Sequence, residues 1–382
     1  SAAGAPLGIG VVGTGAISLR GILPHLSQDD VADSARITAV CDPVIARVRA
    51  VAEQYDVPSA YPSIEELLLD PAVDAVTIAS PIGLHYEHVS RALEANKHVH
   101  VNKTMCISVE EADRLIALAR SRGLSLIASP GEILRPQIDA IRELVTSGAI
   151  GELSWALCGG SFGAYHEQDE QERTDAPGGT SINPAWYFRK PGGGPMYDIT
   201  SYSLHQLTSV LGPAQRVTAL SGIAVRQRTF QGGVVPTEAD DNTVLLVDFG
   251  AARFAVVHGT AAGSVSAQFG ATVYHGTKGT LDGILLDGQQ IDFAGRESTF
   301  GRPVTDWEAQ MRVLPHVTGE HRSIPESHVF EDIMQMVMEV RTGRPSRVTP
   351  EHARHVIEII EAGYTAAESG RTCDLATTFD LP

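Results

Sequence analysis

The chain has 382 residues, 43% of them hydrophobic and 20% charged, and its formal net charge is −17. This length and composition are typical of a globular protein with two domains, each with its own core. The negative charge argues against a nucleic acid or an anionic membrane as a partner, because both would repel the chain. We expect a cytoplasmic protein, since no apolar run is long enough for a membrane helix and the first residues lack the pattern of a signal peptide.

The cysteine and histidine patterns predict neither disulfides nor a metal site. The four cysteines lie far apart and form no Cys-x-x-Cys pair, as expected for free thiols in a reducing compartment. The 14 histidines include no His-Glu-x-x-His arrangement.

The first predicted element is a strand that ends in a glycine turn. The apolar run Ile9–Val12 leads into Gly13-Thr14-Gly15, and a segment that can be helical follows. Gly13 allows a tight turn, and Gly15 has no side chain, so a pyrophosphate can approach the backbone. The amide groups at the helix start and the helix dipole then favour the phosphate charge. This pattern predicts a dinucleotide-binding turn.

A second predicted strand, Arg36–Cys41, is followed directly by Asp42. A carboxylate at this position can accept hydrogen bonds from the adenosine ribose hydroxyls, and it repels a 2′-phosphate. NAD is therefore the expected cofactor. Arg47, one helical turn further on, would suit the 2′-phosphate of NADP, so NADP stays open as the alternative.

Strands and helices continue to alternate up to residue 128. Strands are predicted at 74–80, 98–101 and 124–128, with a short one at Tyr61. Helices are predicted at 44–55, 86–96 and 108–120, and a further one that Ser63 caps and that contains Glu66. This alternation is typical of a doubly wound parallel sheet, which binds ligands at the carboxyl ends of its strands. Several residues that follow predicted strands are therefore expected at one cofactor crevice: Ser80, Pro81, His85, Asn102 and Lys103.

The pattern changes near residue 148. A strand is predicted at 153–159, a helix at 195–211, strands at 216–226, 243–249, 253–259, 264–269 and 272–274, and closing helices at 329–340 and 350–368. Turn residues between the strands favour antiparallel hairpins, so we predict an open mixed, mainly antiparallel sheet with a helix packed on it. The polar stretch 160–194 is much longer than a typical connection, which suggests a lid or a contact between subunits.

Lys103 is the first candidate catalytic residue. It directly follows the apolar strand Val99–Val101, so we expect it at the cofactor crevice. There an ammonium can hydrogen-bond a substrate hydroxyl and stabilise alkoxide character as hydride leaves the carbon. An ordinary surface lysine at a strand end is the alternative.

A second group of candidates follows the triple glycine 192–194. Asp198, Tyr202 and His205 lie at i, i+4 and i+7, so a regular helix would present them on one face. A carboxylate, a phenol and an imidazole together suit proton transfer and the binding of sugar hydroxyls. A polar helix face satisfied within the protein is the alternative.

The segment Trp186-Tyr187-Phe188-Arg189-Lys190 places aromatic side chains beside cations. Such a segment can line a sugar or nicotinamide site, or simply anchor a loop. We predict Trp186 and Arg189 as cofactor contacts. The predicted substrate contacts are Arg135, Tyr165, His166 and Lys190, where the cations could bind an anionic sugar substituent or be plain surface charges.

Taken together, these motifs resemble the glucose–fructose oxidoreductase, inositol dehydrogenase and rhizopine catabolism (Gfo/Idh/MocA) family over nearly the whole chain. The matching segments are Gly13-Thr14-Gly15-Ala16-Ile17, Ser80-Pro81 with His85, Lys97-His98-Val99, Gly148-Ala149-Ile150-Gly151-Glu152, the triple glycine with Asp198, Tyr274-His275-Gly276-Thr277-Lys278-Gly279, Gly343-Arg344-Pro345 and Thr349-Pro350-Glu351.

The resemblance implies a Rossmann domain with a tightly held NAD(P), and it adds Ala16 and Ile17 to the expected cofactor contacts. It implies a second α/β domain with a large mixed sheet that binds substrate and forms a homodimer or homotetramer. We place the first domain at 1–130 and the second at 131–382, with the C-terminal helix packing back on the first domain.

Two departures from the family pattern affect the site. The family usually reads Glu-Lys-Pro where this chain has Asn102-Lys103-Thr104. The family often has His four residues after the aspartate, where this chain has Tyr202. The glucose–fructose oxidoreductase branch also uses tyrosine there, which favours Tyr202 as proton donor and acceptor, with His205 as a competing base.

The sequence thus predicts an NAD-dependent oxidoreductase that acts on a secondary hydroxyl of a sugar, glycoside or cyclitol. The first alternative is an NAD-dependent glycoside hydrolase that works by transient oxidation, elimination and re-reduction. The second is a nucleotide-sensing regulatory protein on a dehydrogenase scaffold.

Overall fold

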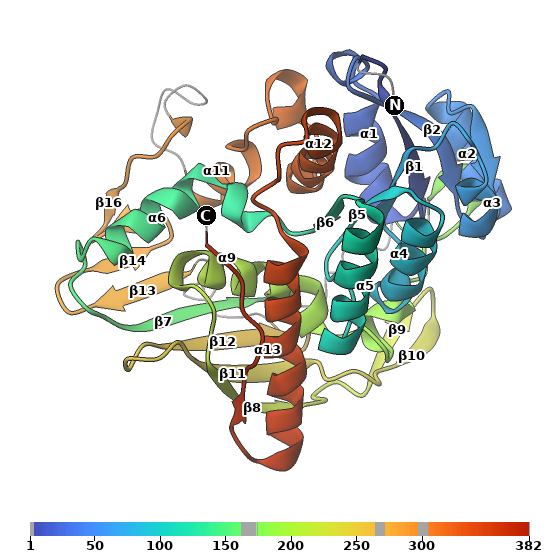
Figure 1. Cartoon of the computed structure of the whole chain (residues 1–382). Coiled ribbons are helices and arrows are strands. Elements are labelled where there is room, and N and C mark those ends of the chain that lie inside the picture. The colour runs from blue at the N-terminus through green and yellow to red at the C-terminus, as the bar shows by residue number, and fades with distance from the viewer. Residues whose placement is uncertain (1–3, 162–172, 174, 264–271, 297–304, 382) are drawn as a thin grey trace.

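The computed structural model describes residues 4–161, 173, 175–263, 272–296 and 305–381 (Figure 1). The predicted strand at 264–269 and the predicted contacts Tyr165 and His166 lie outside these residues. Two large sheets form the framework, a six-stranded parallel sheet and a nine-stranded mixed sheet. The predicted α/β fold class is therefore confirmed.

The parallel sheet has the strand order β3-β2-β1-β4-β5-β6. Its strands are β1 (Leu7–Val12), β2 (Ala35–Cys41), β3 (Ser59–Tyr61), β4 (Ala75–Ile78), β5 (His98–Val101) and β6 (Leu126–Ala128). The central strands β1 and β4 are fully buried and mostly apolar, as expected for strands covered by helices on both faces. The carboxyl ends of all six strands point to one edge of the sheet.

Helices connect these strands, and their ends follow the signals of the sequence. The helices are α1 (Leu23–Leu26), α2 (Ile45–Gln54), α3 (Ile64–Leu68), α4 (His85–Glu94) and α5 (Val109–Arg122). The Ser63 and Ser108 hydroxyls accept hydrogen bonds from the amides of Glu66 and Glu111, three residues further on. Such N-terminal caps satisfy amide groups that have no partner within the helix.

The second sheet has the order β16-β15-β14-β13-β7-β12-β11-β8-β17. Its strands are β7 (Leu153–Gly160), β8 (Arg216–Gly222), β11 (Asn242–Asp248), β12 (Phe254–Thr260), β13 (Val273–Gly276), β14 (Thr280–Asp282), β15 (Leu285–Leu286), β16 (Gln289–Gln290) and β17 (Cys373–Asp374). Among the strands described for this sheet, β7 and β12 are the one pair that runs in parallel. The predicted strand 216–226 ends at Gly222, and the next residues form a separate hairpin of β9 (Gln227–Phe230) and β10 (Gly233–Pro236), which the sequence did not reveal.

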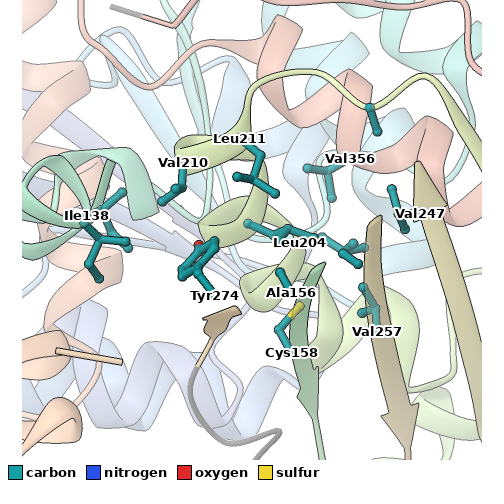
Figure 2. Close-up of a cluster of buried hydrophobic side chains, with 14 of the residues drawn as sticks. Ile138, Ala156, Cys158, Leu204, Val210, Leu211, Val247, Val257, Tyr274 and Val356 are labelled. Atoms are coloured by element: carbon teal, nitrogen blue, oxygen red, sulfur yellow. The ribbon is translucent and has the colours of Figure 1, made fainter. Parts of the chain in front are cut away.

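Helices cover one face of the nine-stranded sheet. They include α6 (Pro136–Thr146), α9 (Ser201–Leu211) and part of α13 (Pro350–Ser369). Figure 2 shows this core, where Leu204 of α9 meets Ala156 and Cys158 of β7 and Val257 of β12. The opposite face carries exposed apolar side chains, since Leu220 is 79% and Leu246 is 51% exposed.

The end of the chain returns to the parallel sheet. After α11 (Asp306–Arg312), helix α12 (Ser327–Thr342) places Val329, Phe330 and Ile333 in one cluster with Leu7 and Ile9 of β1. Helix α13 packs along α5 on one side and β8 on the other (Figure 1). Both closing helices therefore join the two halves of the molecule. In the described part of the chain, no helix combines the length and apolar character needed to cross a membrane.

Candidate active site

A cavity of about 1180 Å³ lies at the carboxyl ends of the parallel strands, between the two sheets. Its size exceeds the range typical of sites for one small ligand, so it can hold a dinucleotide and a substrate together. Most predicted site residues line it: Gly13, Gly15, Ala16, Ile17, Asp42, Ser80, Pro81, His85, Asn102, Lys103, Arg135, Trp186, Asp198 and Tyr202.

The glycine turn is built as the sequence predicts. Gly13 has φ of +91°, and a Cβ there would lie 2.9 Å from the Ala79 carbonyl oxygen, so only glycine fits. A Cβ at Gly15 would meet nothing within 4 Å, which leaves open space beside the backbone for a phosphate group. Ser18 occupies the third small position and donates its hydroxyl to the Gly13 carbonyl oxygen at 2.6 Å. The residues present therefore fit the pyrophosphate of a dinucleotide.

Asp42 is buried, and its carboxylate accepts four hydrogen bonds from the protein. Thr14 donates its amide at 2.9 Å and its hydroxyl at 3.0 Å to Oδ2. The amide of Val44 and Nη2 of Arg47 donate to Oδ1 at 2.9 and 2.7 Å. A carboxylate has about four acceptor positions, so a ribose hydroxyl must share or displace one of these donors. Arg47, which would suit NADP, is thus hydrogen-bonded to Asp42, which favours NAD.

Lys103, Asp198 and Tyr202 meet in the middle of the cavity. The Lys103 ammonium forms an ion pair and hydrogen bond with Oδ1 of Asp198, and both side chains are about nine-tenths buried. The ammonium also lies 5.3 Å from the centroid of the Tyr202 ring. The Asn102 side-chain oxygen accepts a hydrogen bond from the Lys103 amide at 2.8 Å.

A π-helical turn explains which residues of the next segment face the cavity. Met196–Thr200 forms this turn and continues directly into α9. A π-turn contains one residue more than an α-turn, so it shifts the face that later residues present. Asp198, Tyr202 and Gln206 line the cavity, whereas His205 does not.

The prediction that His205 shares the catalytic face is therefore corrected. Its ring packs against His352 of α13, with 4.6 Å between ring centroids. Burial lowers the pKa of His205 to about 3, so the ring is neutral and enclosed in the helical layer. Tyr202 and His205 lie three residues apart in α9, about 60° apart around the helix axis. The π-turn rotates this pair relative to Asp198, and the sequence carries no clear signal for that turn.

The Tyr202 hydroxyl hydrogen-bonds Nε2 of His328 at 2.8 Å. His328 comes from the first turn of α12 and was not among the predicted residues. Burial lowers the pKa of His328 to about 3, and burial together with nearby carboxylates raises the pKa of Tyr202 well above its usual value. Both groups are therefore neutral at neutral pH.

Arg135 is also buried, but it is already paired. Its guanidinium forms two hydrogen bonds with the Glu132 carboxylate, at 2.7 and 2.9 Å. Gln206 donates its side-chain amide to the same carboxylate at 2.8 Å. Glu132 and Gln206 line the cavity but were missed, because a glutamate in a short turn and a glutamine in a helix have no distinctive spacing.

The remaining predicted residues divide into two groups. His85 lines the cavity, but its ring nitrogens lie 2.6 Å from the Thr104 carbonyl oxygen and 2.8 Å from that of Ser80, so it joins two strand-end loops. Arg189 and Lys190 are exposed and do not line the cavity, so neither predicted role is supported by its position. In the described residues, no group of three metal-ligating side chains could hold a metal ion.

Fold and site together define a two-domain, dinucleotide-binding α/β protein. A model described as the NAD-binding Rossmann fold of the Gfo/Idh/MocA oxidoreductase family matches residues 7–129. A model of the C-terminal α/β domain of this family matches residues 142–375. The chain therefore belongs to the Gfo/Idh/MocA family, as its resemblance predicted, and it is an NAD-binding oxidoreductase.

Similar proteins include several dehydrogenases. The chain is 25% identical over 371 residues to scyllo-inositol 2-dehydrogenase (NADP(+)) IolW of Bacillus subtilis, covering 95% of this chain and 94% of that protein. It is 29% identical over 214 residues to D-glucoside 3-dehydrogenase of Escherichia coli, covering 54% of each. These relatives support an oxidoreductase and lend no support to the glycoside hydrolase alternative.

A similar solved structure is that of an oxidoreductase from Agrobacterium radiobacter in complex with NAD+, L-tartaric acid and magnesium. It aligns with a TM-score of 0.69 at 20% identity and covers 96% of this chain and 98% of that one. At this identity the likeness concerns the fold alone.

Proposed function

We propose that this protein transfers a hydride between NAD and a secondary hydroxyl of a sugar, glycoside or cyclitol. The observation that carries the proposal is the meeting of Lys103, Asp198 and Tyr202 in the cavity beside the glycine turn. An ammonium, a carboxylate and a phenol are the groups needed to polarise a hydroxyl and move its proton.

Each of the three residues has a distinct part in this reaction. Lys103 donates a hydrogen bond to the reacting oxygen and stabilises its developing negative charge. Asp198 holds the Lys103 ammonium in place through their ion pair. Tyr202 exchanges the proton of the hydroxyl. Bound NAD supplies the hydride acceptor, and the glycine turn and Asp42 would hold it.

The charges of the cavity favour an uncharged substrate. The described lining contains six basic and six acidic residues. Among the basic residues of this lining are five that pair with lining carboxylates, as Arg20–Glu326, Arg47–Asp42, Arg91–Glu87, Lys103–Asp198 and Arg135–Glu132. An anionic substituent would find each of these cations already neutralised. Because Arg135 is already paired with Glu132, we now expect it to help bind a neutral hydroxylated ring and not a sugar carboxylate.

The names of two relatives agree with this substrate class. One is named a scyllo-inositol 2-dehydrogenase and the other a D-glucoside 3-dehydrogenase. An inositol is an uncharged cyclitol, and a glucoside with an uncharged aglycone likewise carries no charge. We extend this class to the present chain because the cavity has the acid–base residues and the charge balance that it requires.

We also propose that two copies associate through the exposed face of the nine-stranded sheet. Apolar side chains align there across neighbouring strands, since Val244 stands opposite Leu220, and Phe254 opposite Trp155. Phe254 is 48% and Trp155 is 40% exposed. A continuous exposed apolar surface of this kind is typical of a protein interface, and a second copy offers a self-complementary partner.

A substrate panel tests the proposed reaction. Purified protein is incubated with NAD or NADP and with myo-inositol, methyl glucosides, free hexoses and the matching uronates. We expect NADH absorbance with at least one neutral compound and a weaker response to its uronate. Product chromatography separates oxidation from hydrolysis, because hydrolysis would release methanol from a glucoside without net NADH. Turnover of uronates alone, or of none of these compounds, would contradict the proposal.

A further inference from the structure

The hydrogen bond between Tyr202 and His328 joins two distant parts of the chain inside the cavity. The Tyr202 hydroxyl lies 2.8 Å from Nε2 of His328, and the two rings meet edge to face at an interplanar angle of 74°. The His328 side chain is 9% exposed, so solvent does not compete strongly for this bond. The contact therefore holds the phenol at one angle relative to the Lys103 ammonium.

The second nitrogen of the imidazole shows which tautomer the site favours. Nδ1 of His328 is buried and has no hydrogen-bond partner among the described residues. A proton on Nδ1 would be a buried donor without an acceptor, which is unfavourable by about 1–3 kcal/mol. A proton on Nε2 is used in the bond to Tyr202 and also faces Oε2 of Glu326, 3.9 Å away. The neutral Nε2–H tautomer is therefore favoured.

We propose that His328 is a positioning residue, which donates its Nε2–H to the Tyr202 oxygen and so directs the tyrosine's own proton toward the reacting oxygen of the substrate. This proposal rests on the proposed function, in which Tyr202 exchanges the proton. A phenol oxygen that accepts from His328 cannot at the same time use its own hydrogen in that bond. Its O–H is therefore free to point into the cavity.

The proton balance follows from this geometry. In the direction of reduction, the Tyr202 O–H bond breaks as an O–H bond forms on the substrate oxygen. Bound NADH would supply the hydride for the new C–H bond. The resulting tyrosinate is stabilised by the Nε2–H of His328 and by the Lys103 ammonium, and it regains a proton from solvent. In the direction of oxidation, each step runs in reverse and one proton is released.

The groups that face Tyr202 from the surrounding elements make this stabilisation necessary. The carboxylates of Glu326, Asp198, Glu132 and Asp332, together with burial, raise the pKa of its phenol. Two cations oppose them: the Lys103 ammonium lies 5.3 Å from the centroid of the Tyr202 ring, and the buried Arg135 guanidinium also interacts electrostatically with Tyr202. Because a hydrogen bond to the charged form of a group favours that form, loss of the His328 donor would raise this pKa further.

Two substitutions at His328 separate positioning from packing. In His328→Leu the donor is lost, and we expect kcat to fall about 10–100-fold, the range for loss of one donor to a developing charge, with little change in KM. Because oxidation needs the deprotonated phenol as base, the rising limb of the kcat profile for alcohol oxidation, on its acidic side, should move to higher pH. In His328→Gln the side-chain amide can donate in place of Nε2–H, and we expect most of kcat to return. Loss of activity in both variants alike, without a shift of the pH profile, would overturn the proposal.

A double-mutant cycle tests whether His328 acts through Tyr202. In a Tyr202→Phe background, His328→Leu should cause no further loss of kcat, since there is no hydroxyl left to orient. Additive losses in the double variant would contradict the proposal, because they would mean that His328 acts by another route.

A spectroscopic measurement works even without turnover. The ¹⁵N NMR spectrum of protein labelled at histidine reports the tautomer of each ring, and the signals missing from His328→Gln identify His328. We expect a neutral ring protonated at Nε2 at pH 7. A charged ring or the Nδ1–H tautomer would overturn the proposal for His328, whatever the substrate panel shows. An Nε2–H ring in a protein that oxidises no alcohol would instead contradict the proposed function alone.

Discussion

The two sheets of this molecule differ in how their residues reach the cavity. The parallel sheet supplies residues directly at its strand ends, so Gly13 follows β1, Asp42 follows β2 and Lys103 lies two residues after β5. The nine-stranded sheet supplies its residues indirectly, through the π-turn and helix α9 that pack on it. Asp198 and Tyr202 belong to this second group.

This difference has a physical cause. A parallel strand buried on both faces can present polar groups only at its ends, and all its neighbours end at the same edge. The mixed sheet has one covered and one exposed face, so buried and exposed residues alternate along a strand such as β11. The proposed catalytic residues do not lie on its described strands. The cofactor half of the site is thus determined by local sequence, and the substrate half by packing between distant segments.

The largest expected effect is at the contact between the two halves. In Lys103→Ala the ammonium that joins β5 to Asp198 is lost, and with it the donor to the reacting oxygen. We expect kcat to fall about 10³-fold, in line with loss of a general acid–base and electrostatic group. Binding of NAD, measured by fluorescence titration or calorimetry, should change little. Turnover within a few-fold of the wild type would remove Lys103 from the mechanism.

A smaller effect is expected within the cofactor half. In Asp42→Asn the Arg47 guanidinium loses its carboxylate partner, 2.7 Å away in the wild type. We expect the ratio of kcat/KM for NADP to that for NAD to rise about 10–100-fold, the range for a new charge-assisted hydrogen bond to the 2′-phosphate. The double variant Asp42→Asn with Arg47→Gln is the control and should show no such gain. An unchanged ratio in the single variant would mean that Asp42 and Arg47 do not determine the preference between NAD and NADP.

The sequence predicted the fold of the cofactor half almost completely. The caps at Ser63 and Ser108, the glycine turn and the strand ends are each recognisable within a few residues, because local rules determine them. It predicted the substrate half only in part. Lys103, Asp198 and Tyr202 are distinctive residue types in the sequence, but His328 becomes a neighbour of the site only when α12 packs back, 126 residues along the chain from Tyr202.

The exposed face of the second sheet gives a further contrast, because the parallel sheet has no such face. In Leu246→Lys a charge is placed among the apolar side chains of β8, β11 and β12. If two copies pair here, the buried unpaired ammonium should weaken association at least about 10-fold, measured by analytical ultracentrifugation. Leu69→Lys, at another exposed apolar position that is 82% exposed, is the matched control and should leave association unchanged. A wild-type chain that sediments as a monomer would refute the pairing.

The smallest effect on catalysis is expected at His205, where the helical prediction and the π-turn disagree. In His205→Leu, activity per folded molecule should stay within about two-fold of the wild type, whereas Tyr202→Phe, less than one turn away, should lose most of it.

The substitution His205→Leu should change the stability of the protein instead. Burial lowers the pKa of His205 to about 3, below the value near 6.5 of an unfolded chain. The unfolded state therefore binds the proton first as pH falls, and the free energy of unfolding decreases between pH 6.5 and 3 by about 1.4 kcal/mol per pH unit for this group. His352 and His355 add to the decrease in the same sense. Urea titrations at pH 7.5 and 5.5 should show a shallower decrease in His205→Leu than in the wild type. If this variant instead lost its activity while remaining folded, His205 would have a part in the reaction that its place outside the cavity does not explain.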